Sequence, residues 1–139
     1  MKHRIHGAAM AAALLLGATA AQAEGGLQMQ VTARTDAGGA APACMLGFRL
    51  TNRTATRVGT FSAEIRAVHA QTGAELRLSS ATVPLMGVEP GQAKEWNSGA
   101  VSGARCDAVR LQVVRMTCVR RCGPAAWTQQ GLAAVEVLR

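Results

Sequence analysis

Apolar and polar residues alternate along most of the chain from residue 27 onward, which is the pattern of half-buried β-strands. In the first such segment Leu27, Met29 and Val31 alternate with polar neighbours. No stretch after the N-terminal segment has the spacing of an amphipathic helix. The alternation predicts short strands at residues 27–32, 44–51, 61–68, 76–85, 93–97, 109–113 and 132–138.

Turn-forming residues separate or interrupt these strands. Asn52-Arg53-Thr54 matches the glycosylation triplet, and we expect an unmodified turn there. Pro90-Gly91 predicts a turn as well, and Ser79–Ala81 predicts a bulge or a change of direction. At Val114 the apolar positions change phase, as they do at a β-bulge. The pattern predicts an all-β fold, an antiparallel immunoglobulin-like β-sandwich of about seven strands, with a small barrel as the alternative.

The first 23 residues have the organisation of a signal peptide. Lys2 and Arg4 precede an uncharged apolar run, and Ala21-Gln22-Ala23 fits the pattern at which signal peptidase cuts. The run is too short to span a bilayer, and no later segment reaches about 18 uncharged apolar residues. We therefore expect a signal peptide at residues 1–23 and a single β-sandwich domain at residues 24–139. The protein would be periplasmic or secreted and would not span the membrane.

The positive charge of the chain favours a solvated surface over nucleic-acid binding. The formal net charge of +7 falls to +5 when Lys2 and Arg4 leave with the signal peptide. The remaining basic residues are nearly all arginines spread along the chain, without the interleaved aromatic residues that stack on bases. Attraction to an acidic partner or to anionic envelope components is the alternative.

Four cysteines follow the signal peptide, and an even number in an exported protein predicts two disulfides. Three pairings are open. Cys118 and Cys122 are close in sequence, in a loop expected after the sixth strand. Cys44 and Cys106 lie at or just before the second and sixth strands, which start at the same end of an immunoglobulin-like sandwich. We expect the pairs Cys44–Cys106 and Cys118–Cys122.

The sequence offers few groups for catalysis or metal binding. His69 is the single histidine after the signal peptide, and no nucleophile-elbow or phosphate-loop motif is present. We expect no enzyme activity, no cofactor and no metal site. The alternative is an envelope copper-binding or thiol-redox protein, whose candidate copper ligands are Met29, Met45, Met86, Met116 and His69.

Several short segments between Cys44 and Cys118 form a recognisable series. They are the strand Phe48–Asn52, the amphipathic strand Phe61–Ala67, the hairpin Gln71–Ala74 and the turn Val88–Gly91. In these segments the chain resembles bacterial exported immunoglobulin-like or fibronectin-III-like domains, including the FxLYD type. The aromatic signature of FxLYD is missing, since the chain has no tyrosine. The resemblance implies a sandwich that binds, spaces or scaffolds, and it brings no catalytic residue.

These observations predict a non-enzymatic exported β-sandwich that binds a protein partner or a component of the cell envelope. Such a fold engages partners through loops or by strand addition, and edge pairing between two copies would give a homodimer. Arg120, Arg121 and Trp127 are the candidate partner-binding residues, because arginine and tryptophan are favoured interface anchors. In the alternative, Trp127 packs on the end of the sandwich and both arginines are solvated.

Overall fold

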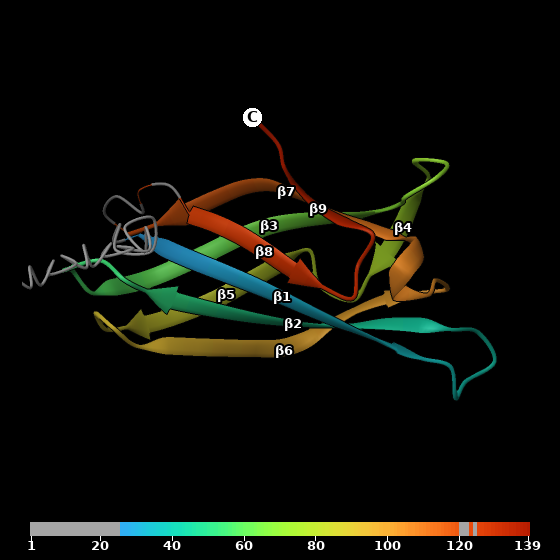
Figure 1. Cartoon of the computed structure of the whole chain (residues 1–139), viewed down its shortest axis with the longest axis horizontal. Coiled ribbons are helices and arrows are strands. Elements are labelled where there is room, and N and C mark those ends of the chain that lie inside the picture. The colour runs from blue at the N-terminus through green and yellow to red at the C-terminus, as the bar shows by residue number, and fades with distance from the viewer. Residues whose placement is uncertain (1–25, 120–122, 124) are drawn as a thin grey trace, which may run out of the picture.

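The computed structural model describes residues 26–119, 123 and 125–139, and this part of the chain is built from β-strands (Figure 1). The strands are β1 (Leu27–Asp36), β2 (Ala43–Asn52), β3 (Val58–His69), β4 (Glu75–Leu78), β5 (Thr82–Val88), β6 (Ala93–Ser102), β7 (Val109–Cys118), β8 (Ala125–Gln130) and β9 (Ala134–Val137), with a short 3-10 turn, η2 (Cys106–Ala108), before β7. The expected all-β class is confirmed for these residues. None of them forms a helix of the length and apolarity that crossing a membrane requires. The predicted signal peptide lies outside the described residues.

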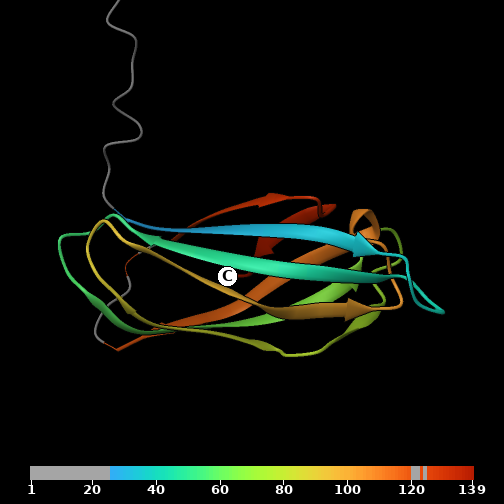
Figure 2. The ribbon, with the colours of Figure 1, turned by 90° about the horizontal axis from the view of Figure 1, so that it is seen from below.

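The strands form one sheet that is nearly closed into a barrel. Their order is β8-β1-β2-β6-β4-β3-β7-β9, and β5 pairs with β3. The ladders are antiparallel except β1–β8 and β7–β9, which are parallel. The short strand β4 pairs with both β3 and β6, so it joins two layers that lie face to face, β8-β1-β2-β6 and β5-β3-β7-β9 (Figure 2). Because the sheet is nearly closed, the structure is closer to the small barrel predicted as the alternative than to a sandwich of two unconnected sheets.

Two irregularities predicted from the sequence are present. The segment 76–85 is divided at Ser79–Ala81 into β4 and β5. In the β3–β7 ladder Glu64 pairs with Arg115 and Ile65 with Val113, which leaves Val114 as a bulge. The bulge changes which residues of β7 face the interior, and this matters for the candidate site.

The core is made of inward-facing residues from both layers. Its largest fully buried side chains include Phe48, Phe61, Leu27, Met29, Leu50 and Leu111. Two half-buried tryptophans pack against this core from strands at the borders of the layers, Trp96 from β6 and Trp127 from β8. The ring of Trp96 lies 5.8 Å, centroid to centroid, from that of Phe48.

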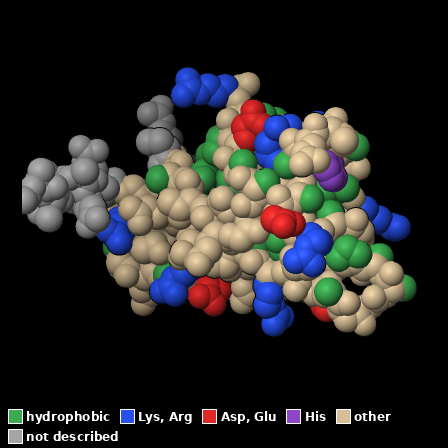
Figure 3. Space-filling view, turned by 45° about the vertical axis from the view of Figure 1, so that its right-hand side comes forward, with side chains coloured by type: hydrophobic (Ala, Val, Ile, Leu, Met, Phe, Trp, Pro, Cys, Tyr) green, Lys and Arg blue, Asp and Glu red, His purple; other side chains and the backbone are tan. Residues whose placement is uncertain are grey.

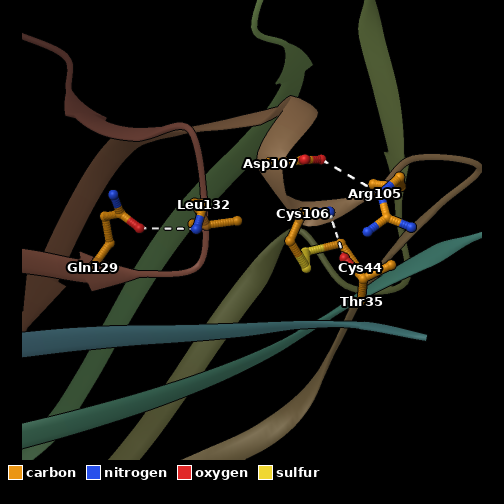
Figure 4. The surroundings of a disulfide bond; sticks show 7 residues. All are labelled: Thr35, Cys44, Arg105, Cys106, Asp107, Gln129 and Leu132. Atoms are coloured by element: carbon orange, nitrogen blue, oxygen red, sulfur yellow. Dashed lines mark hydrogen bonds and ion pairs between the residues drawn. A yellow bond between two sulfur atoms is a disulfide. The ribbon is translucent and has the colours of Figure 1, made fainter. Parts of the chain in front are cut away.

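A disulfide joins Cys44, near the beginning of β2, to Cys106 in η2, directly before β7 (Figure 4). This pairing confirms the prediction for these two cysteines. Both are almost completely buried, and the N–H of Cys106 donates to Oγ1 of Thr35 in β1 at 2.9 Å. The other predicted pair, Cys118–Cys122, includes Cys122, which lies outside the described residues.

Asn52 is the one fully buried polar side chain in the described part of the chain. Its Nδ2 donates to the carbonyl oxygens of Thr56, at 2.8 Å, and Val88, at 3.0 Å. Its Oδ1 accepts from the N–H of Thr54 at 3.0 Å and from the Thr54 hydroxyl at 2.6 Å. One side chain thus holds together the turn after β2 and the end of β5. The glycosylation triplet is a turn, as predicted, and its amide is buried.

Gly131 connects β8 to β9 in a turn that approaches β1. Its φ is 98°, and a Cβ at this position would overlap the carbonyl oxygen of Ala33. The N–H of Leu132 donates to Oε1 of Gln129 at 2.9 Å, which fixes the same turn (Figure 4). Gly131 is therefore required both by backbone conformation and by space.

We expect Gly131→Ala to lower the free energy of unfolding by about 2–3 kcal/mol, because the backbone must shift as well as hold an unfavourable φ. Denaturant unfolding measures the loss. Gly73→Ala is the matched control, since Gly73 also has a positive φ, 72°, but faces open space. The control should lose only about 1 kcal/mol. Equal losses in the two variants would contradict the steric role of Ala33.

Candidate partner-binding site

The structure describes one of the three predicted partner-binding residues. Trp127 lies in β8, whereas Arg120 and Arg121 lie outside the described residues. Along β8 the exposure alternates, with Ala125, Trp127 and Gln129 partly buried and their neighbours exposed. Trp127 stands opposite Met29 in the parallel β1–β8 ladder, and Met29 is fully buried. The indole of Trp127 is therefore turned toward the interior.

The indole of Trp127 reaches from β8 to β7. Its Nε1–H donates to Sδ of Met116 at 3.3 Å, and both side chains pack against the core. Met116 faces inward because the bulge at Val114 shifts the alternation of β7 by one residue. Without that shift Arg115 would face the interior in its place. The bulge thus places the sulfur that meets the indole.

Beside this contact, β7 and β8 form no ladder with each other within the described residues. We call the edge of β8 and the facing edge of β7 at residues 115–117 the β7–β8 seam. Within the described residues β8 forms a ladder with β1 alone. β9 pairs with β7 only from Arg110 to Val113, so within the described part of the chain residues 115–117 have a ladder with β3 alone. In the part of the chain that the structure describes, these two strand edges therefore lack a further ladder partner, and Trp127 and Met116 form the floor between them.

The rim of the seam has little protection against another strand. β8, with the sequence Ala-Ala-Trp-Thr-Gln-Gln, contains neither a charged residue nor a proline. Exposed edges in soluble proteins usually have such residues, because they prevent unwanted pairing. Arg115 on β7 is paired with Glu64 at 3.2 Å, and Val119, directly after β7, is 64% exposed. The rim is thus neutral on one side and partly apolar on the other.

The gap between β5 and β6 is different. Pro84 in β5 has no N–H to donate to a further strand. Nζ of Lys94 in β6 donates to the carbonyl oxygen of Met86 in β5 at 2.8 Å, so a side chain closes this gap. Proline and lysine are the residues that natural sheets use to block an edge. Of these two gaps, the β7–β8 seam is the less protected one.

Charged side chains do not single out another site on the face shown in Figure 3. Lysine and arginine side chains are spread over this face, with acidic side chains among them. Most of the ion pairs are exposed, as for Arg49–Glu95 and Arg57–Glu89. Exposed pairs of this kind contribute little to stability and leave the surface well solvated.

Comparisons with known protein families, with curated protein sequences and with solved structures each found no match. A function for this chain is therefore inferred from its geometry.

The five candidate copper ligands are distributed over β1, β2, β3, β5 and β7. Met29 is buried in the core, Met45 and Met86 are exposed on β2 and β5, and the sulfur of Met116 accepts the hydrogen bond from Trp127. Nδ1 of His69 accepts from the backbone of the turn that follows β3. Within the described residues, no three His, Cys, Asp or Glu side chains are grouped closely enough to hold a metal ion.

Proposed function

We propose that this chain is a non-enzymatic exported β-domain that binds an extended segment of a partner protein by strand addition in the β7–β8 seam. The observation behind the proposal is that two strand edges without a further ladder partner among the described residues flank an apolar floor of Trp127 and Met116. An added strand would form backbone hydrogen bonds with an edge and place alternate side chains on that floor. Trp127 would be the anchor that the sequence predicts.

The proposed segment is neutral or acidic, with apolar residues at alternate positions. β8 offers no charge to a partner, and the chain without its signal peptide would have a net charge of +5, which favours an acidic partner at long range. A component of the envelope other than a protein has no backbone with which to pair. A second copy of this chain is the other occupant that the edge would accept, and the experiment distinguishes it.

The exported location and the immunoglobulin-like description belong to the same proposal. A buried disulfide between Cys44 and Cys106 supports an oxidising compartment. Two face-to-face layers linked by that disulfide support an immunoglobulin-like arrangement. The relation to FxLYD-type domains rests on the sequence resemblance alone. The proposal also includes the second disulfide, Cys118–Cys122, which would fix the chain between β7 and β8.

The test begins with capture of envelope proteins on the folded protein, followed by purification of the captured partner. Hydrogen–deuterium exchange of the complex should then slow at residues 115–117 and 125–130, because a new ladder protects amides at these edges. Exchange that slows elsewhere and not at the seam would overturn the proposal. Capture of only further copies of the chain, or of nothing, would overturn it as well.

Met116→Lys should weaken partner binding at least about tenfold, because an inward-pointing charge in the floor opposes strand addition. Met86→Lys is the matched control, since it adds the same charge to β5 at an exposed position. Binding is measured by calorimetry after thermal unfolding has shown that each variant is folded. If Met116→Lys does not fold, Thr117→Lys on the exposed face of β7 replaces it, with Thr82→Lys as control. Equal binding by a seam variant and its control would contradict the proposal.

A further inference from the structure

A hollow of about 270 Å³ lies on the outer face of the layer β8-β1-β2-β6. It is lined by Thr32, Ala33 and Arg34 of β1, Met45, Leu46 and Gly47 of β2, and Asn97 of β6. The hollow is distinct from the seam, whose floor faces the interior. An inference about it does not rest on strand addition.

The absence of a side chain at Gly47 leaves room for two polar side chains that line the hollow. Arg49 and Met45, two residues away on either side, project from the same face of β2 and are exposed. A Cβ on Gly47 would lie 2.7 Å from Oδ1 of Asn97 and 3.0 Å from Oγ1 of Thr32. The φ of Gly47 is not positive, so the backbone does not require glycine here. The close approach of two polar side chains does.

An irregularity in the β2–β6 ladder places Asn97 over Gly47. Leu46 pairs with Gly99 and Phe48 with Trp96, so two residues of β6 lie opposite the single residue Gly47. Such bulges redirect a side chain, and they are frequent next to functional sites. Thr32 stands directly opposite Gly47 in the β1–β2 ladder. The hydroxyl and the amide thus meet from the two strands that flank β2.

The polar groups around the hollow are unused. Within the described residues, the side chains of Thr32, Arg34 and Asn97 form no hydrogen bond or ion pair. By contrast, Arg49 beside the hollow is paired with Glu95 at 3.4 Å. No acidic residue lines the hollow. An arginine, an amide and a hydroxyl therefore offer donors to an anionic group that nothing in the lining repels.

We propose that this hollow binds a carboxylate attached to a small aliphatic group. A guanidinium donates two parallel N–H bonds to a carboxylate, and a neighbouring amide or hydroxyl adds a third. Met45, 36% exposed, provides apolar surface for a methyl group next to the carboxylate. The carboxylate comes from a peptide C-terminus or from a free small acid. Both have the same chemistry at this site.

The test is an NMR titration of the isotope-labelled protein with N-acetyl-alanine and with tetra-alanine, each as the free acid and as the C-terminal amide. Both acids should cause saturable shifts at the amides of Thr32, Gly47 and Asn97. The amides should bind at least about tenfold more weakly, because they lack the charge that pairs with Arg34. Tighter binding of tetra-alanine identifies a peptide end as the ligand, and tighter binding of N-acetyl-alanine identifies a free acid. No saturable shift with either acid would overturn the proposal.

Two substitutions test the residues. Arg34→Gln should weaken binding of the acid at least about tenfold, whereas Arg57→Gln, an exposed arginine outside the hollow, should leave it unchanged. Gly47→Ala should abolish binding, since the added methyl group displaces Asn97 and Thr32. Arg34 is exposed, so its variant tests the proposal even if Gly47→Ala does not fold. Equal binding by Arg34→Gln and the wild-type protein would refute the assignment.

Discussion

Replacing both Cys44 and Cys106 by alanine should lower the free energy of unfolding by about 4 kcal/mol, as the loop-closure model gives for a loop of this length. The two cysteines are 62 residues apart in sequence, so their bond restricts the unfolded chain over much of the domain. It also joins β2 to η2, and hence the two layers at one end of the barrel. Guanidinium unfolding of the oxidised protein and of the variant measures the difference.

The second predicted pair provides the comparison. Replacing Cys118 and Cys122 by alanine should cost only about 2 kcal/mol, because the loop that they would close is short. Each double variant replaces two cysteines by alanine, so the two variants are matched in the number and kind of substitutions. A larger loss in the Cys118/Cys122 variant than in the Cys44/Cys106 variant would contradict the loop-length argument for this protein.

The strands that could be predicted are those in which large apolar residues occupy every second position. β1, β2 and β3 have this pattern, and all three contribute fully buried residues to the core. β8 was missed because its inward positions include a small residue, Ala125, and a polar one, Gln129. Trp127 alone does not establish an alternation. β8 is stabilised by pairing with β1, and the alternation of residues within β8 does not reveal that pairing.

The candidate site depends on contacts between distant parts of the chain. Trp127 was a predicted anchor, with packing as the alternative, and the structure gives it a half-buried position on the core beside an open edge. Its role in binding stays a prediction. The openness of the seam follows from the parallel ladder of Leu27–Thr32 with β8, which joins residues from opposite ends of the chain. Sequence periodicity contains no information on such pairing. The hollow at Gly47 was equally invisible, because it requires the bulge in β6.

Asn52→Ala should lower the free energy of unfolding by about 3–4 kcal/mol, since it removes the four hydrogen bonds of a fully buried side chain. The carbonyl oxygen of Val88 loses its Asn52 donor, and the N–H of Thr54 loses its acceptor. The carbonyl oxygen of Thr56 keeps the Thr54 hydroxyl as a donor. Denaturant unfolding gives the loss, and faster amide exchange in the turn after β2 should accompany it. The chain contains one other asparagine, Asn97, which is exposed, so Asn97→Ala is the matched control and should change stability by less than about 0.5 kcal/mol. Equal losses would mean that the Asn52 side chain does not stabilise this end of the barrel. The turn after β2 and the end of β5 would then depend on their backbone hydrogen bonds alone.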